Sequence, residues 1–198
     1  LPLIQVQHHH AHLAACLAEN AWESSEPVIG LIFDGTGYGT DGSIWGGEIL
    51  VGGYRGSQRR FHLLPVRLPG GDLAVRKPAR TALSWLAAAG IFAEEYELPP
   101  VKALSKEERA AVQAQLESGF NAPLTSSMGR LFDAVASILG ICHEISYEAQ
   151  AAIALESAAD PDEQGIYPIL LQNAAIDPRE MQRELVRQKH ARLRIHHN

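Results

Sequence analysis

The amino-acid sequence predicts an α/β or α+β fold, and three observations support that prediction. A run rich in alanine and leucine opens the chain, three strand-like runs follow, the first of them rich in β-branched residues, and helix-capping signals dominate after residue 72. With 198 residues and 46% hydrophobic content, the chain can form one domain or two small lobes. We find no internal repeat and no low-complexity tract in this order of elements.

The first predicted helix begins in the segment His8-His9-His10-Ala11-His12 and continues through AHLAACLAENAW. Alanine, leucine and glutamate favour helix. Residues four apart share one helix face, so His8 and His12 could bind one ion together, and a neutral imidazole is the commonest transition-metal ligand. A polar helix start that binds nothing is the alternative, but four histidines in five positions favour a metal site.

Three strands are predicted next. Val28–Phe33 (VIGLIF) is a short apolar run typical of a buried strand, and it leads into a glycine-rich segment, 34–39, that predicts a tight turn. Ser43–Tyr54 and Arg60–Leu68 predict the second and third strands. Because the connections are short, the strands should be antiparallel neighbours.

The rest of the chain predicts helices. Asp72 is a plausible N-cap for a helix over Leu73–Ala89 that Gly90 ends, and Pro78 should kink this helix or move its start. Ser105-Lys106-Glu107-Glu108 predicts a capping box that opens a helix extending to about Glu117. Further helices are expected over residues 127–139, 148–158 and 178–189, the last with proline in its first turn.

Composition excludes some functions. The net charge of −6 argues against nucleic-acid binding, and no apolar run is long enough to span a bilayer. The N-terminal sequence lacks the layout of a signal peptide. Cys16 and Cys142 form no CxxC pair, which suits a reducing cytoplasm with both thiols buried. We therefore expect a cytoplasmic protein with neither a nucleic acid nor a membrane as partner.

The segment Asp34-Gly35-Thr36-Gly37 is the second candidate site. Glycine lets backbone amides approach an oxyanion, Thr36 offers a hydroxyl, and Asp34 can bind a cation; a plain hairpin turn is the alternative. With the histidine pair it gives His8, His12 and Asp34, a metal set of two nitrogens and one oxygen with room for substrate. A thermolysin-type metalloprotease is disfavoured, because the position of its glutamate base is occupied by His9.

A third candidate region is the start of the helix predicted after Ser126-Ser127. The serine cap followed by Gly129 gives a helix N-terminus that a nucleotide could approach closely. Arg130 could pair with a phosphate, and Asp133 could accept hydrogen bonds from ribose hydroxyls. The simpler alternative is an amphipathic helix with an exposed Arg130–Asp133 pair.

Two smaller expectations concern residues outside these motifs. We expect four large aromatic side chains in the core rather than stacked on a ligand, namely Trp45, Trp85, Phe33 and Phe132. The polar terminal segment RLRIHHN, with His196 and His197, should be a solvated end.

Five ordered motifs carry a family resemblance: VQHHHAHLAA, FDGTGYGTDGSIWGGEIL, LPGGDLAVRKPARTAL, SSMGRLFDAVASILG and ISYEAQAA. Together, over Val6 to about Ala152, they resemble the carbamoyltransferase domain of the hydrogenase maturation factor HypF. The resemblance implies an actin-like ATPase fold of two ribonuclease-H-like lobes, similar to threonylcarbamoyladenosine enzymes and antibiotic O-carbamoyltransferases. Residues 1–26 would end the first lobe with the metal-binding helix. Residues 27–198 would form the second lobe and a helical interlobe region, without its C-terminal part.

The resemblance also implies an activity. The remaining HypF domains would supply ATP-derived carbamoyl adenylate, and this domain would transfer the carbamoyl group to the C-terminal cysteine of a HypE-like acceptor during NiFe hydrogenase maturation. An iron or zinc ion, held by His8, His12 and Asp34, would act as a Lewis acid. His9 or His10 would serve as acid or base. The nucleotide and phosphate would lie against Gly35, Thr36, Gly37, Gly129, Arg130 and Asp133.

Departures from the family pattern leave alternatives open. Ala149 stands where the family's YEGQAA has glycine, and Ala154 stands where a glutamate is common, with Glu156 the nearest carboxylate. The acylphosphatase, zinc-finger and adenylating domains are not in this sequence, so we expect a fragment. Two other readings are a metal- and nucleotide-binding module without catalysis, and a related enzyme that carbamoylates a small molecule or tRNA.

Overall fold

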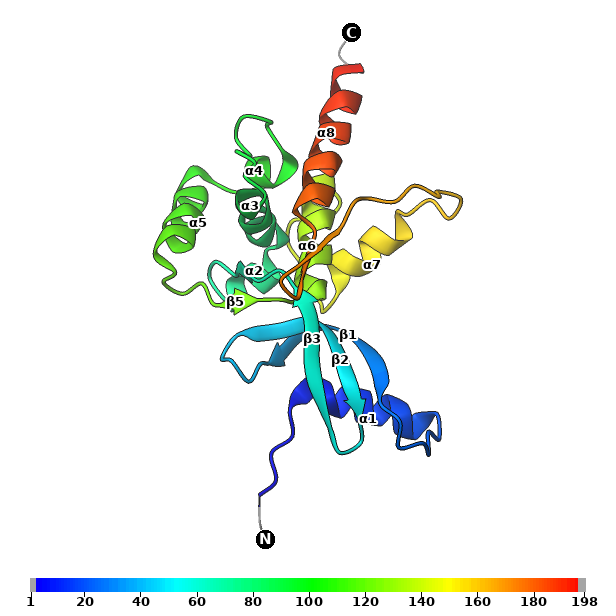
Figure 1. The fold of residues 1–198 in the computed structure, drawn as a ribbon. Coiled ribbons are helices and arrows are strands. Elements are labelled where there is room, and N and C mark those ends of the chain that lie inside the picture. Colours follow the sequence, from blue (N-terminus) through cyan, green and yellow to red (C-terminus); the bar gives the residue numbers. More distant parts are fainter. Residues whose placement is uncertain (1–2, 196–198) are drawn as a thin grey trace.

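A computed structural model describes residues 3–195, with side chains as far as Lys189; His196 and His197 lie outside the described residues. The chain forms two halves (Figure 1). In the sheet half, helix α1 (His8–Glu19) packs against strands β1 (Val28–Tyr38) and β2 (Ile44–Gly53), and β3 (Gly56–Leu63) lies on the other side of β2. The other half is mostly helical. The mixed α/β prediction is confirmed, and the two-lobed actin-like arrangement stays a prediction.

The three long strands form the antiparallel order that the sequence predicts, since β2 pairs with both β1 and β3. The third strand is shorter than predicted and ends at Leu63, because Pro65 cannot donate a hydrogen bond to a neighbouring strand. Four short strands complete the seven-stranded sheet. Strand β4 (Val66–Arg67) is the end of the predicted third strand, separated from β3, and three strands were not predicted: β5 (Leu124–Thr125), β6 (Leu170–Gln172) and β7 (Ala175–Asp177).

The glycine-rich segment after Phe33 is not the predicted tight turn. Strand β1 continues to Tyr38, with a register shift: Phe33 pairs with Gly47, whereas Gly37 pairs with Trp45. Three β1 residues therefore lie opposite a single residue of β2, which makes a bulge. The actual turn follows at residues 39–43, where the Gly39 amide donates to the Ser43 carbonyl over 3.0 Å. The bulge turns Asp34 out of the regular strand pattern.

Pro78 divides the predicted helix over residues 73–89 into α2 (Asp72–Arg76) and α3 (Pro78–Ala88). Asp72 lies in the first turn of α2 and is not its N-cap, which is Gly71. Helix α4 (Pro99–Ala103) was not predicted. Helix α5 (Lys106–Ser118) has the predicted capping box between Ser105 and Glu108, with Gly119 in a left-handed conformation at its end.

The last three helices are α6 (Met128–Leu139), α7 (Gln150–Ser157) and α8 (Arg179–Ile195), close to the predicted ranges. The main core lies where α3, α6 and α8 pack together, around the buried Trp85 and its neighbours Leu63, Val66, Leu86, Leu131, Ala134, Ile138 and Val186. A second, smaller core joins α1 to the sheet through Leu13, Leu17 and Leu50. No helix of the described residues is long and apolar enough to cross a membrane.

Some predictions about burial are wrong. Trp45 and Trp85 are buried as expected, but Phe33 and Phe132 are exposed. Alternate residues of β1 point to opposite faces, and Phe33 lies on the face away from α1. Phe132 lines an apolar groove between α6 and α7. Cys16 is exposed and Cys142 is partly buried, so the expectation of two buried thiols is wrong as well.

Candidate metal and nucleotide site

The structure brings His8, His12 and Asp34 together, where α1 meets the bulge of β1. His8 Nε2 lies 2.8 Å from Asp34 Oδ2 and 3.1 Å from His12 Nε2. The third separation, from His12 Nε2 to Asp34 Oδ2, is 3.7 Å. Two residues one helical turn apart thus present their ring nitrogens to one carboxylate oxygen, as the spacing of the histidines predicts.

Asp34 is oriented by its own backbone neighbours. Its Oδ1 accepts hydrogen bonds from the Gly35 amide at 2.6 Å and, more weakly, from the Thr36 amide at 3.5 Å. Partial burial raises the pKa of Asp34, but the hydrogen bonds from His8 and from these amides outweigh burial and hold the pKa below its ordinary value. The carboxylate is therefore ionised at neutral pH, with Oδ2 directed toward the histidines.

These amide contacts change the role predicted for the glycine segment. The sequence predicts that the amides of Gly35, Thr36 and Gly37 point at a phosphate. In the structure the first two point at Asp34 Oδ1, and the Thr36 hydroxyl donates to the Gly35 carbonyl. The segment thus orients a carboxylate, and two of the three backbone donors that we expected for an oxyanion, the amides of Gly35 and Thr36, are already engaged.

The donor set fits a small divalent metal ion. Zinc with bonds of about 2.0–2.2 Å in a tetrahedron holds its ligand atoms about 3.3–3.6 Å apart. The three separations of 2.8, 3.1 and 3.7 Å surround that range. His9 is another candidate, because ligand atoms of His8, His9 and Asp34 lie within 4.8 Å of one another. The sequence predicts His12 instead as the third ligand, and its Nε2 lies 3.1 Å from His8 Nε2 and 3.7 Å from Asp34 Oδ2.

His9 is fully buried and is not placed to act as an acid or base on a substrate. Its Nδ1 lies 3.1 Å from the Gln7 amide nitrogen, and its ring packs 5.8 Å from the Trp45 ring. Its Nε2 has no hydrogen-bond partner among the described residues. Burial lowers the pKa of His9, which favours the neutral ring. His9 packs between the rings of His8 and Trp45, and its predicted catalytic role stays a prediction.

Gly37 makes room for these rings. A Cβ atom there would lie 2.4 Å from His9 Cε1 and 2.5 Å from His8 Cδ2, closer than any real contact. The sequence predicts that Gly37 approaches a phosphate, but its neighbours are imidazoles. Gly37 is required because two histidines of α1 pack directly on this strand residue.

His10 points away from the site. Its Nε2 lies 2.9 Å from the carbonyl oxygen of Gly53, at the far end of β2. Successive helix residues are rotated by about 100°, so His10 does not share the face of His8 and His12, and this position gives no support to the predicted catalytic role. Its contact instead ties α1 to the sheet.

A cavity of about 370 Å³ lies beside Asp34. It joins four predicted motifs, and its lining consists of Asp34, Gly35, Thr36, Val75, Arg76, Arg130, Ile145, Ser146, Tyr147, Glu148 and Ala149. Ala149 has φ of 61°, a left-handed conformation that glycine adopts freely and alanine does not. The glycine expected at this position thus serves the backbone turn that opens α7.

Arg130 and Asp133 form a buried pair rather than the exposed pair of the simpler alternative. Asp133 is 1% exposed, which leaves no path for a ribose to reach it directly. Arg130 Nη2 lies 3.0 Å from Asp133 Oδ2. Burial raises the pKa of Asp133 to about 6, although the charge of Arg130 lowers it. Asp133 therefore acts on Arg130, which itself lines the cavity.

Gly129 and Ser127 fix the start of α6 against the bulge. A Cβ atom on Gly129 would lie 2.9 Å from the Gly35 Cα, so only glycine permits this packing. The Ser127 hydroxyl lies 2.9 Å from the Asp34 carbonyl and 2.8 Å from the Gly35 carbonyl, and it accepts from the Arg130 amide. The N-terminus of α6 thus contacts backbone, where the sequence predicts a nucleotide.

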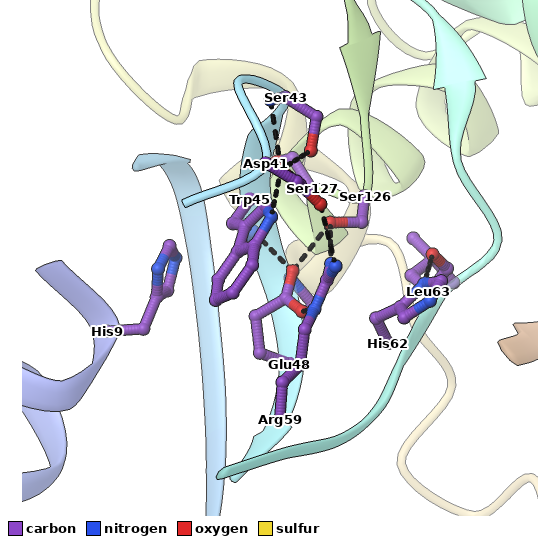
Figure 2. Close-up of polar contacts among 12 residues, drawn as sticks. His9, Asp41, Ser43, Trp45, Glu48, Arg59, His62, Leu63, Ser126 and Ser127 are labelled. Carbon is purple, nitrogen blue, oxygen red and sulfur yellow. Dashed lines mark hydrogen bonds and ion pairs between the residues drawn. The ribbon is translucent and has the colours of Figure 1, made fainter. Parts of the chain in front are cut away.

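A polar network around the fully buried Glu48, behind the site, was not predicted (Figure 2). Glu48 Oε2 pairs with Arg59 Nε, and Arg59 also reaches Asp41 Oδ2 at 3.2 Å and the Ser126 hydroxyl at 3.1 Å. Figure 2 shows the Trp45 ring between His9 and this network. The available signal was Glu48 itself, a lone carboxylate in a strand predicted to be buried, which requires a buried partner.

Comparisons with known proteins identify the family of the chain. Residues 30–197 match the family model described as carbamoyltransferase, Kae1-like domain, second subdomain. The chain is 48% identical over 181 residues to carbamoyltransferase HypF of Rhodobacter capsulatus, and 39% identical over 159 residues to the probable carbamoyltransferase HypF of Methanocaldococcus jannaschii. These alignments cover 90% and 80% of this chain.

Solved structures give the same relationship. A crystal structure of full-length HypF in the phosphate- and nucleotide-bound form aligns over 94% of this chain with a TM-score of 0.81 and 41% identity. The HypF of T. kodakarensis aligns with a TM-score of 0.80 and 34% identity. The chain spans only about a quarter of these relatives, 24% of the Rhodobacter protein and 25% of the crystallised chain. The chain thus belongs to the HypF carbamoyltransferase family, where it corresponds to the second subdomain of the Kae1-like domain.

Proposed function

We propose that this chain supplies the metal-binding and donor-binding part of a carbamoyltransferase that acts in hydrogenase maturation. The observation that carries the proposal is the convergence of His8, His12 and Asp34 Oδ2 within 2.8–3.7 Å, beside a cavity of about 370 Å³. The family membership supports the reaction class. The donor is ATP-derived carbamoyl adenylate, and the acceptor is the C-terminal cysteine of a HypE-like protein.

The residues suit an acyl-type transfer. The acceptor thiolate attacks the carbamoyl carbon, the bond from that carbon to the phosphate oxygen breaks, and AMP leaves with the bonding electrons. A zinc or iron ion bound by His8, His12 and Asp34 would supply a Lewis acid for the developing charge. Arg130, held by Asp133, gives the cavity a cation that can pair with the phosphate.

The cavity wall opposite the glycine segment supports nucleotide binding. Tyr147 and Ile145 offer an apolar surface for a base, and Arg76 offers a second cation. We propose that Gly35, Thr36 and Gly129 form the floor on which the donor lies and that the remaining HypF domains deliver it. A cytoplasmic location accords with two cysteines that form no disulfide.

Metal analysis tests the proposal directly. We expect purified chain to bind zinc or iron and the His8→Ala/His12→Ala variant to lose it, whereas His10→Ala, on the same helix, should retain it. Elemental analysis and competition with a chromophoric chelator measure the content and the affinity. Unchanged metal content in the double variant would remove the ligand assignment.

Transfer is tested in a full-length relative that carries the same substitutions. Mass spectrometry of the acceptor cysteine, after incubation with carbamoyl phosphate and ATP, reports carbamoylation. The double histidine variant should lose transfer while the His10 variant keeps it. Metal binding without any dependence of transfer on these histidines would show that the ion is structural.

A further inference from the structure

We propose that Glu48 and Arg59 are positioning residues of the metal site. The fully buried Glu48 and the partly buried Arg59 form an ion pair that fixes Asp34 of β1 relative to His8 of α1. Neither residue touches the ligand atoms. The inference rests on the proposed metal site and deepens it, because it explains how two ligands on separate elements keep a fixed separation. Two series of contacts connect the ion pair to the ligands, one to Asp34 and one to His8 (Figure 2).

The first series of contacts connects Glu48 to Asp34. Glu48 is fully buried, and its Oε1 accepts hydrogen bonds from the Gly46 amide at 3.1 Å and the Gly47 amide at 3.2 Å. Oε1 also accepts from the Ser126 hydroxyl at 2.5 Å. The Glu48 carboxylate therefore connects two segments. One is the β2 backbone opposite the bulge, and the other is Ser126, which precedes the N-cap of α6.

Both segments that Glu48 binds press on Asp34. A Cβ atom on Gly46 would lie 2.5 Å from the Asp34 carbonyl oxygen and 3.1 Å from the Ser127 Cα, so β2, the bulge and the α6 cap are in direct contact. Ser127 adds its hydroxyl to the Asp34 and Gly35 carbonyls. The backbone of Asp34 is thus held from two sides by groups that one carboxylate organises.

The second series of contacts connects Arg59 to His8. The Arg59 guanidinium lies 3.9 Å from the centre of the Trp45 ring, which suits a cation–π contact. Trp45 Nε1 donates to Asp41 Oδ1 at 2.9 Å, and Asp41 in turn accepts from Arg59. The ring so fixed packs on His9, whose ring lies 5.0 Å from that of His8. Arg59 thereby sets the position of the ring behind His8.

A contribution to folding stability alone does not explain why Glu48 and Arg59 form an ion pair here. Removing two charges from water is costly, and apolar residues of similar size often replace buried ion pairs without loss of stability. What apolar residues cannot do is bind the Gly46 and Gly47 amides, the Ser126 hydroxyl and Asp41 in one fixed geometry. That geometry is what a metal site with ligands from two elements requires, since the groups behind the ligands set their orientation.

Zinc affinity and cobalt absorption test the inference in the intact chain. We expect Glu48→Ala and Arg59→Met each to weaken zinc binding about 10–100-fold, the usual effect of removing groups that orient metal ligands. Glu48→Gln, which keeps an acceptor for the Gly46 and Gly47 amides, should recover part of that loss. The visible absorption of bound Co²⁺, which reports coordination geometry, should change in the first two variants.

Two controls separate positioning from folding. Asp177→Asn breaks another partly buried ion pair, with Arg179, at the start of α8, and should leave zinc affinity unchanged. The double variant Glu48→Met/Arg59→Met removes both charges and should recover thermal stability without recovering zinc affinity. A double variant that recovers both, or single variants with parental affinity, would overturn the positioning role.

The outcomes also distinguish this inference from the proposed function. If His8→Ala/His12→Ala abolishes zinc binding and the Glu48 and Arg59 variants leave it intact, the metal site stands and the positioning role is wrong. If the histidine variant binds zinc as the parent does, the metal site itself is wrong, and the positioning role is overturned with it.

Discussion

Each half of the molecule contains one fully buried carboxylate paired with an arginine, and the two pairs behave differently. In the sheet half, Glu48 accepts hydrogen bonds from Arg59, Ser126 and two backbone amides. Burial raises the pKa of Glu48, but these bonds outweigh it and lower the pKa below 4.5. In the helical half, Asp133 Oδ2 accepts no hydrogen bond among the described residues, and burial raises its pKa to about 6.

Both carboxylates are buried, so the difference shows that hydrogen bonding decides the direction in which the pKa of a buried acidic residue shifts here. The two halves are also stabilised in different ways. The helical half packs an extensive apolar core around Trp85, whereas the sheet half has a small core at Leu13, Leu17 and Leu50. Directional polar contacts supply much of the order around the candidate site, where geometry matters more than packed volume.

The largest effect is expected from breaking the well-bonded pair. Glu48→Ala leaves the Gly46 and Gly47 amides and the Ser126 hydroxyl without their buried acceptor, and it removes one of the two carboxylates of the partly buried Arg59. We expect it to lower the free energy of unfolding by about 3–5 kcal/mol. Urea unfolding followed by circular dichroism measures this change. The matched substitution Asp133→Ala should have a smaller effect, because the carboxylate it removes is poorly satisfied. Equal losses would mean that the two pairs contribute alike.

The pH dependence of stability should run in opposite directions for the two carboxylates. Because folding raises the pKa of Asp133, its contribution is fully present below the unfolded value near 4 and is lost as pH rises through about 6. The expected loss is on the order of 2–3 kcal/mol. Glu48, with a lowered pKa, contributes above its unfolded value of about 4.5, and that contribution is lost as pH falls through the folded value.

Two variants check these slopes. Asp133→Asn should flatten the loss of stability between about pH 4 and 6, and Glu48→Gln should flatten the loss on the acid side of about 4.5. Unfolding free energies at a series of pH values measure both slopes. If Asp133→Asn keeps the parental slope, then the pKa of Asp133 is not raised by folding.

Gly37→Ala should act on the site more than on the fold. A methyl group there meets His8 and His9, so one ring must move, and we expect zinc affinity to fall about tenfold or more. Gly53→Ala is the matched control, because it lies on β2 and a Cβ atom there meets nothing within 4 Å. Chelator competition compares the two variants, and an equal affinity for both would show that α1 shifts freely over β1.

The smallest effect is expected at Ala149. Its left-handed conformation strains a residue with a Cβ, so Ala149→Gly should raise the free energy of unfolding by about 0.5–1 kcal/mol. Ala152→Gly, inside α7, should instead lower it by about 1 kcal/mol. Thermal unfolding of the pair tests the sign. A loss of stability in both variants would mean that Ala149 is not strained.

The sequence predicted helix boundaries well where a single residue type determines the local backbone conformation. Pro78 divides a helix, and Ser105 and Glu108 form their capping box, because both effects depend on neighbours within one turn. The short strands β6 and β7 were missed, since their pairing with β3 depends on contacts distant in sequence. The bulge of β1 was predicted as a turn because glycine and aspartate favour both.

The candidate site was predicted only in part, because local sequence patterns specify some of its contacts and not others. The helical period brings His8 and His12 together, and a carboxylate at a strand end was a reasonable third ligand. The direction of His10 was missed because sequence spacing does not show which face of α1 meets the sheet. The pairing of Glu48 with Arg59 depends on the β2–β3 register, and that register shifts between Ile49 and Leu50. No local pattern encodes such a shift.

The link between His8 and Asp34 joins residues 26 positions apart, and one of them belongs to a helix with only a small apolar contact to the sheet. An ion shared by the two residues would therefore hold α1 against β1, and the contacts of the ion with His8 and His12 would be lost when the helix detaches. By mass action, metal would suppress that local opening in proportion to its affinity. Amide hydrogen exchange should then slow in α1 on adding zinc, while α3 and α6 exchange as before. The occupancy of the ion would set how long the first helix stays attached.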